Sequence, residues 1–364
     1  MRRTMLLSLI AILPGLFPET KAFGQTADDL FDPAVLHEIR INVHPSDWKQ
    51  LKAHFDENTH YPADFHWIFQ GKDVAVPQVS IRSRGLGSRS SVKPGLQVQF
   101  DRFTDHPFLG LRSIVLRNNT QDPSMLRERI AMTFMNLMGM PAPRQAHTRL
   151  YVNGEYAGLY SIVEAVDPAF LQRVFGQNNG YLYKHEWTFG WSFEYLGADP
   201  NAYSPDPFEP ENHETDPDPS PLELMVRAIN LTSDPYFQKE VSPYIDLNKF
   251  MTYIAVENFI AEQDGLIGDF GVANIYLYRF ENSTLSQFIP WDKSNSFYSL
   301  DWPIFRHIDA FVLSRRAFAI PELRQAYLNA LSTSAELAGD TGGWLEQEIT
   351  QEYLQIREAA LEDP

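Results

Sequence analysis

The sequence predicts an α+β protein with a sheet-based N-terminal lobe, a mainly helical C-terminal lobe and a cleft between them. Alternating apolar residues, typical of strands, prevail in the first half, whereas helical apolar spacing prevails in the second half. The chain has 364 residues, of which 44% are hydrophobic, so it is long enough for two domains with a real core. We place the N-terminal lobe at residues 25–163 and the C-terminal lobe at residues 164–364.

The first lobe begins with a predicted strand at residues 36–43, followed by a helix that starts at Pro45-Ser46-Asp47. Two further strands are predicted at residues 74–84 and 92–100. The small residues 85–91 predict a loop between these two strands.

A helix at residues 123–138 follows, with an apolar stripe and a stop at Gly139. The sequence Asn153-Gly154 lies between two alternating runs and predicts a tight hairpin that ends at Glu164. This helix and hairpin complete the N-terminal lobe.

The second lobe is predicted to contain helices at residues 222–232, 246–262 and 321–361, with a short strand pair near 275–278 and 288–291. Residues 198–221 are rich in Pro, Asp and Glu, and they predict a mobile, solvated surface insertion rather than a metal site.

The composition excludes several functional classes. A net charge of −17 argues against nucleic acid as the main partner, because a phosphate backbone needs a basic face. The chain has no cysteine, which excludes thiol catalysis and Cys-ligated zinc. Its serines lack the G-x-S-x-G context of a serine hydrolase.

The N-terminus is typical of a signal peptide. Arg2 and Arg3 precede a short apolar run that extends to Phe17, and small residues follow near a cleavage site after Gly24. We therefore expect residues 1–24 to be removed and the protein to be secreted, periplasmic or on the cell surface. The apolar run is too short to span a bilayer, and no transmembrane span is expected elsewhere.

Residues 257–298 contain the strongest candidates for chemistry, which are Asp264, Asp269, Asn274 and Asp292. Carboxylates and an amide at the ends of short strands are suited to hold Mg²⁺ beside a phosphate chain. In this interpretation Asp264 or Asp269 accepts the proton of the nucleophile, and Asn274 and Asp292 bind the metal. The same residue types also cap helices and turns, so the spacing alone leaves both interpretations open.

A second candidate region is the loop between the predicted strands at 74–84 and 92–100. Arg84 and the small residues after it could fold over phosphates, with Lys93 reaching them and Glu128 on the following helix pairing with the lysine. The alternatives are a hairpin turn with solvated charges and an ordinary exposed helix face.

Together these segments resemble the spore-coat protein H (CotH) kinase family, whose members are secreted or surface proteins with an atypical protein-kinase-like fold. The resemblance covers about residues 80–298, and its most specific stretch is VNGEYAGLYSIVEAVD, with DGLIGDFGVANIYLYRF and FIPWDKSNSF further along. It implies a two-lobed, kinase-like fold and transfer of phosphate from ATP, with Mg²⁺ or Mn²⁺, to Ser/Thr residues of a surface or coat protein.

The resemblance also implies roles for individual residues. Asp264 matches the catalytic-loop aspartate, Asn274 the N-x-Y-L-Y position and Asp292 the first aspartate of W-D-x-D. Glu164 falls at the hinge beside adenine. Ser294 replaces the second acid of W-D-x-D, and the several lysines that the family carries after R-x-R-G are reduced to one. A non-catalytic surface or adhesion module with the same fold therefore remains an alternative.

Overall fold

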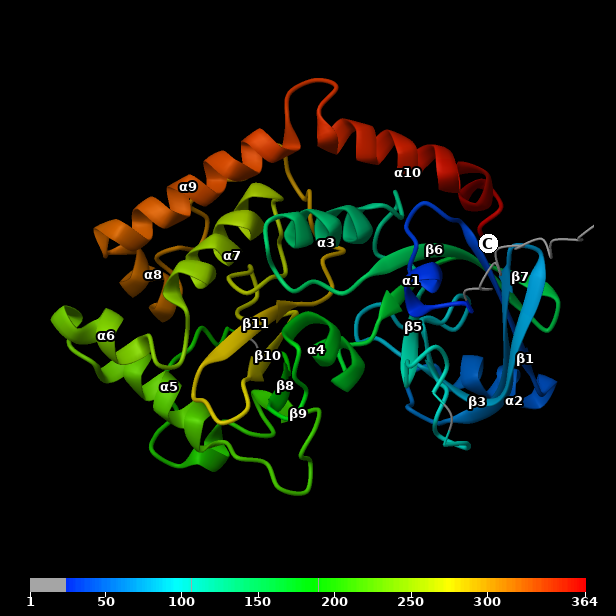
Figure 1. The fold of residues 1–364 in the computed structure, drawn as a ribbon, viewed down its shortest axis with the longest axis horizontal. Helices are drawn as coiled ribbons and strands as arrows, with labels where there is room; N and C mark the ends of the chain where they lie inside the picture. Colours follow the sequence, from blue (N-terminus) through cyan, green and yellow to red (C-terminus); the bar gives the residue numbers. More distant parts are fainter. Residues whose placement is uncertain (1–23, 106, 189) are drawn as a thin grey trace, which may run out of the picture.

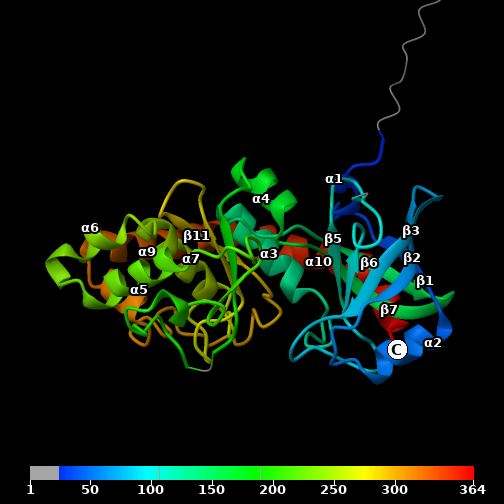
Figure 2. The ribbon, with the colours of Figure 1, turned by 90° about the horizontal axis from the view of Figure 1, so that it is seen from below.

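The structure, a computed structural model, describes residues 24–105, 107–188 and 190–364. One part of the molecule is a β-barrel, and the other is a group of helices packed around a smaller sheet (Figures 1 and 2). The predicted α+β class is confirmed. The predicted signal peptide lies outside the described residues, apart from Gly24.

Seven strands form the barrel, in the order β1-β2-β3-β4-β5-β7-β6. Neighbouring strands are antiparallel except β1 and β6, which pair in parallel and close the barrel. Closure was not predicted, and it removes the exposed edges that an open sheet would leave. The strands are β1 (His37–Val43), β2 (Tyr61–Phe69), β3 (Lys72–Ser83), β4 (Leu96–Gln99), β5 (Ser113–Arg117), β6 (Gln145–Val152) and β7 (Glu155–Glu164).

The predicted hairpin is the β6–β7 connection, in which Tyr151 pairs with Tyr156 and Val152 with Glu155. Both turn residues have positive φ, at 52° for Asn153 and 84° for Gly154. Two-residue hairpin turns of this kind need positive φ, which Asn and Gly adopt at low cost.

The second part contains a four-stranded sheet in the order β11-β10-β8-β9. Its strands are β8 (Tyr181–His185), β9 (Phe208–Pro210), β10 (Ile275–Arg279) and β11 (Ser286–Pro290). A large apolar core lies between this sheet and the helices around it. The helices of this part are α4 (Pro168–Phe175), α5 (Ser220–Leu231), α6 (Phe237–Val241), α7 (Leu247–Phe259), α8 (Val312–Phe318) and α9 (Pro321–Ala338), with short 3-10 turns at Pro200–Ala202 and Asp234–Tyr236.

A separate apolar cluster connects the barrel to the second sheet. It contains Val115 and Val163 from the barrel wall and Tyr276, Ile289 and Trp291 from β10, β11 and the residue after β11. This contact places the end of β5 beside the loop that follows β11.

The helix predicted at 123–138 is α3 (Arg127–Leu137), which starts four residues later. Asp122 explains the difference, because its carboxylate accepts hydrogen bonds from the backbone N–H groups of Ser124 and Arg127, at 2.9 and 2.8 Å. These bonds hold a tight turn before the helix begins.

The insertion predicted as a solvated loop at 198–221 is solvated only in part. Tyr203 and Phe208 are fully buried in it, and β9 pairs with β8 at the edge of the second sheet. Large aromatic side chains among the acidic residues supply apolar area that composition alone does not reveal.

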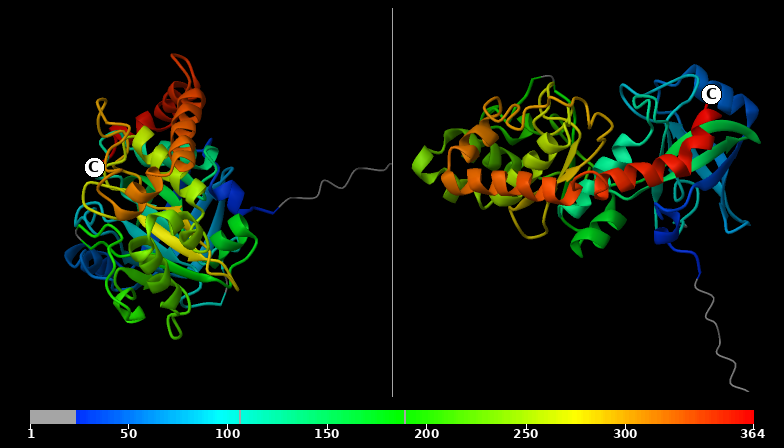
Figure 3. Two further views of the ribbon diagram at one scale, coloured as in Figure 1. Left: turned by 90° about the vertical axis from the view of Figure 1, so that its left-hand side faces the viewer. Right: turned by 90° about the horizontal axis from the view of Figure 1, so that it is seen from above.

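The C-terminal helical region consists of two helices, because Gly339 and Gly342 interrupt it at positive φ. Helix α9 packs on α7, and α10 (Trp344–Leu361) crosses α3 and returns to the barrel (Figure 3). Two short helices, α1 (Ala27–Leu30) and α2 (Pro45–Ala53), accompany the barrel. The predicted lobe boundary at residues 163/164 stays a prediction. None of the helices in the described ranges is long and apolar enough to span a membrane.

Candidate functional site

The candidate site forms where β5, α3 and the loop after β11 meet. In β5, side chains alternate between the two faces of the barrel wall. Ile114 and Leu116 point into the barrel core, whereas Val115 packs against the second sheet. Arg117 therefore leaves β5 on the side of the second sheet, where Asp292 follows β11.

Arg117 joins two acidic residues from different elements. Its Nη1 lies 2.5 Å from Asp292 Oδ2, and its Nε lies 2.8 Å from Glu128 Oε2 in the first turn of α3. Gln145 at the start of β6 donates a hydrogen bond of 3.0 Å to the other Glu128 oxygen. The side chains of Arg117 and Glu128 are less than 10% exposed, so little solvent screens this pair.

The surroundings set the ionisation of this group. Burial raises the pKa of Glu128 to about 7, although the charge of Arg117 opposes that shift. Burial would also raise the pKa of Asp292, but the charge of Arg117 and hydrogen bonds from Arg117 and Ser294 lower it below its usual value. Asp292 is therefore ionised at neutral pH.

Arg84 lies beside the same centre. Its guanidinium carbon is 4.9 Å from the centre of the Trp291 ring, and that of Arg117 is 5.3 Å from the same ring. Burial lowers the pKa of Arg84. Among the described residues, none accepts a hydrogen bond from the Arg84 side chain. Arg117 Nη2 is buried and has no hydrogen-bond acceptor among them. Two cations with unused donors suit an anion at this position.

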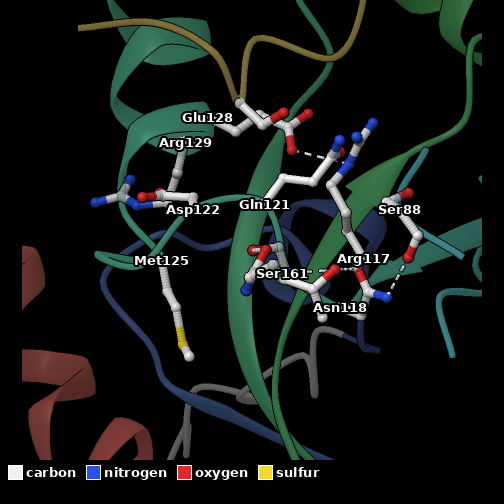
Figure 4. Close-up of a pocket in the computed structure, with 12 residues that line it drawn as sticks. Ser88, Arg117, Asn118, Gln121, Asp122, Met125, Glu128, Arg129 and Ser161 are labelled. Atoms are coloured by element: carbon white, nitrogen blue, oxygen red, sulfur yellow. Dashed lines mark hydrogen bonds and ion pairs between the residues drawn. The ribbon is translucent and has the colours of Figure 1, made fainter. Parts of the chain in front are cut away.

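A small polar pocket opens beside Arg117 and Glu128 (Figure 4). Ser88 of the small-residue loop, Ser161 of β7 and Ser294 line it, together with residues 117–122 of the β5–α3 connection. Asn118 donates hydrogen bonds to the carbonyls of Ser88 and Lys93, at 2.8 and 2.7 Å, and so fixes the loop 84–95 over the pocket.

Asp264 and Asn274 form the other half of the site. Asn274 Nδ2 donates to Asp264 Oδ2 at 3.0 Å and to the Asp264 carbonyl at 2.9 Å. Burial raises the pKa of Asp264, and the charge of Asp292 adds to the shift while that of Lys293 opposes it. Asn274 and Asp292 have positive φ, at 51° and 47°, which is uncommon for residues other than glycine and frequent at functional sites.

A buried ionic network holds these loops together. Lys293 is fully buried, 2.8 Å from Glu257 Oε1, and donates to the Asn274 carbonyl at 3.3 Å. Glu257 accepts a hydrogen bond from the backbone N–H of Leu266, and Glu262 accepts one of 2.8 Å from the backbone N–H of Asp264. Lys293 thereby fixes the loops that contain Asp264, Asn274 and Asp292.

Asp269, the other predicted catalytic residue, is occupied by different partners. Asp269 Oδ1 accepts a hydrogen bond of 2.7 Å from Arg306 Nη2 and lies 2.7 Å from His307 Nε2. Asp269 Oδ2 accepts a hydrogen bond of 3.2 Å from Gln263. Its pKa is lowered, since these hydrogen bonds outweigh burial. Asp269 therefore holds the 301–308 segment in place. Of the two predicted catalytic aspartates, Asp264 is the one that lies beside Asn274.

Lys93 and Glu128 are not brought together. The Lys93 ammonium is 2.6 Å from Asp363 and donates to the Leu159 carbonyl at 3.0 Å, whereas Glu128 pairs with Arg117. The predicted Lys93–Glu128 pair is therefore wrong, because Lys93 turns toward the C-terminal end of the chain. Arg117 occupies the position that sequence reasoning had assigned to a lysine.

Glu164 ends β7 in a separate ionic cluster. Arg144 and Arg173 approach its two carboxylate oxygens at 2.7 and 2.5 Å. No described residue of the Arg117–Asp292 group contacts it. A direct role of Glu164 toward a nucleotide stays a prediction.

The oxygen atoms near Asn274 fit a divalent cation. Oδ1 of Asp264 and Oδ1 of Asn274 accept no hydrogen bond from the residues that the structure describes. Together with ionised Asp292 they offer the hard oxygen donors that Mg²⁺ and Mn²⁺ bind. Across the described ranges, no three His, Asp or Glu side chains form a metal-binding group, so such a site would depend on the Asn274 amide and on ligand oxygens.

Sequence reasoning missed Arg117 and Lys293. The signal for Arg117 is its place at the end of an apolar strand, SIVLR, directly before the turn that starts α3. Lys293 adjoins Asp292, but nothing in the local pattern distinguishes a buried lysine from an exposed one.

Comparisons with known proteins assign the chain to a family. Residues 81–338 match the family described as CotH kinase protein. The chain is 25% identical over 347 residues to inner spore coat protein H of Bacillus subtilis (strain 168), covering 89% of this chain and 88% of that protein. It is 33% identical over 87 residues to an inner spore coat protein H-like protein of the same organism, covering 22% and 28% of the two chains. The chain therefore belongs to the CotH kinase protein family.

Proposed function

We propose that this protein is a kinase-like phosphotransferase that moves the γ-phosphate of ATP to Ser/Thr residues of a surface or coat protein. The observation that carries the proposal is the position of Arg117 between Glu128 of α3 and Asp292. Protein kinases need a strand lysine paired with a glutamate of the next helix, and an aspartate for the metal; here Arg117 would take the place of the lysine. The barrel and the helical part would then correspond to the two lobes of a kinase-like fold.

Arg117 and Arg84 would bind the phosphates. Both guanidinium groups have donors without acceptors among the described residues, and both lie over Trp291 next to Asp292. Arginine presents a planar set of donors that suits phosphate oxygens. The loop 84–95, held by Asn118, would cover this side of the nucleotide.

Asn274 and Asp292 would hold Mg²⁺ or Mn²⁺, and Asp264 would orient the acceptor. When bound, the metal supplies positive charge that neutralises the phosphate oxygens. Asp264 is the carboxylate that would accept the acceptor hydroxyl's hydrogen bond, because Asn274 already fixes its Oδ2 and leaves its Oδ1 available. The role of Asp269 would be to position the 301–308 segment.

One observation favours the non-catalytic alternative. Both oxygens of Asp292 are engaged, one by Arg117 at 2.5 Å and one by Ser294 at 2.9 Å, and Ser294 stands where the family often has a second acid. A protein that keeps these contacts when ATP is added would use the fold for binding a partner.

The test is transfer of labelled phosphate from ATP to the protein itself, with Mg²⁺ or Mn²⁺, in wild type and three variants. Asp292→Ala and Asp264→Asn should each lower the rate by at least about 100-fold, the scale of one lost charge-stabilising or proton-transfer contact. Asp269→Asn is the matched control and should keep the rate within about tenfold.

Absence of Mg·ATP binding by the wild-type protein would refute the proposal. Binding without transfer to any acceptor would support the non-catalytic alternative. If Asp269→Asn removed transfer and Asp264→Asn did not, the two aspartates would exchange roles.

A further inference from the structure

Helix α10 lies outside the residues that match the family, yet it and the residues after it contact α3 and the loop 84–95, which border the proposed site. It begins at Trp344, crosses α3 and ends beside the barrel (Figures 1 and 3). The contact residues Glu348, Glu352, Ile356, Ala359 and Asp363 recur every three or four residues, so they form one face of the helix and its end.

The polar part of this contact is buried. Arg129 follows Glu128 on α3, and its Nε lies 2.6 Å from Glu352 Oε1 while its Nη2 lies 2.8 Å from Glu348 Oε1. The side chains of Arg129 and Glu352 are 6% and 0% exposed. Removing Glu352 is costly, because it leaves the buried Arg129 guanidinium with Glu348, whose side chain is 20% exposed, as its remaining acidic partner among the described residues.

The apolar part continues along the same face. Ile356 and Ala359 pack with Leu126, the residue before α3, with Ile130 of α3 and with Leu159 of β7. Tyr156 of β7 donates a hydrogen bond of 2.9 Å to the Ala359 carbonyl. Helix α10 thereby touches α3 and β7 together and limits how α3 can move against the barrel.

The end of the chain reaches the loop over the pocket. Asp363 Oδ1 accepts hydrogen bonds from Lys93 at 2.6 Å and from the backbone N–H of Leu159 at 2.7 Å. Lys93 belongs to the loop 84–95. Its backbone carbonyl also accepts a hydrogen bond from Asn118, the residue after Arg117. The Asp363 side chain therefore connects this loop to β7.

We propose that α10 is a built-in positioning element that holds α3 and the loop 84–95 so that Glu128 meets Arg117. Kinases place this glutamate by moving the corresponding helix, and here a segment of the same chain would fix it. Arg129, Glu352 and Asp363 act through α3 and the loop, and are positioning residues. The inference rests on the proposed function for its effect on ATP, but not for its effect on α3.

The test uses the full chain with Glu352→Ala, Asp363→Asn and the matched control Glu358→Ala, whose side chain is exposed on the same helix. Amide hydrogen exchange is measured for α3, the loop 84–95 and the barrel strands β1 and β2. Binding of Mg·ATP is measured by calorimetric titration on the same samples.

Glu352→Ala should raise exchange in α3 at least about fivefold and leave β1 and β2 unchanged, because local opening becomes easier where contacts are lost. It should also weaken Mg·ATP binding at least about fivefold, since a smaller share of molecules has the binding geometry. Asp363→Asn should raise exchange in the loop 84–95, and Glu358→Ala should change neither quantity.

Unchanged exchange in α3, or faster exchange with unchanged ATP affinity, would overturn the inference. If Glu352→Ala does not fold, the Asp363→Asn variant decides: faster amide exchange in the loop 84–95 supports the inference, and unchanged exchange overturns it. If the wild type binds no Mg·ATP, the proposed function fails, and the exchange of α3 alone then supports or overturns the positioning by α10.

Discussion

Replacing Arg117 by methionine should destabilise the protein strongly. Methionine keeps much of the side-chain volume but removes the guanidinium. Glu128, whose side chain is 7% exposed, then loses the contact of 2.8 Å, and Asp292 loses the contact of 2.5 Å. Removing one partner of a buried ion pair costs about 3–5 kcal/mol. We therefore expect Arg117→Met to lower the free energy of unfolding by about that amount, measured by urea denaturation followed by fluorescence.

Arg112, which directly precedes β5, provides a matched control. Arg112 pairs with Asp101 at 2.5 Å, but its side chain is 64% exposed, so Arg112→Met should cost at most about 1 kcal/mol. The double variant Arg117→Met with Glu128→Gln should lose less than the sum of the two single losses, by roughly 0.5–3 kcal/mol. Equal losses for the two arginine variants, or strict additivity in the double variant, would refute the ionic account of this contact.

Two further predictions concern buried basic side chains. His185 stacks on Trp191 at 5.5 Å, has no described hydrogen-bond partner, and has its pKa lowered by burial to about 3. The His185 imidazole binds a proton near pH 6.5 in the unfolded chain but only near pH 3 in the folded chain. The contribution of neutral His185 to stability is therefore present above pH 6.5 and is lost as the pH falls toward 3. From pH 7 to pH 5 the loss should be about 2 kcal/mol, and His185→Phe should remove that part of the urea-measured pH dependence; an unchanged dependence in this variant contradicts the assignment. Arg84→Met should weaken Mg·ATP binding at least about tenfold while lowering the free energy of unfolding by less than about 1 kcal/mol, because the guanidinium lacks an acceptor. A large loss of stability with unchanged ATP affinity would show that Arg84 is structural.

Local patterns predicted many elements because neighbouring residues determine them. The Asn153-Gly154 turn, the strand at β1 and the helices α5 and α7 follow from turn chemistry and apolar spacing. Barrel closure did not follow, since the parallel pairing of β1 with β6 joins residues more than 100 positions apart. No short-range pattern encodes such a pairing.

The candidate site divides in the same way. The sequence by itself pointed to Asp264, Asp269, Asn274 and Asp292, because residue type and spacing along the chain are local properties, and it left the choice between the first two open. Only the tertiary structure decided that Glu128 pairs with Arg117, that Lys93 pairs with Asp363 and that Asp269 binds Arg306. A buried charge takes the partner that the packed elements bring within about 3 Å, and that distance depends on the whole fold.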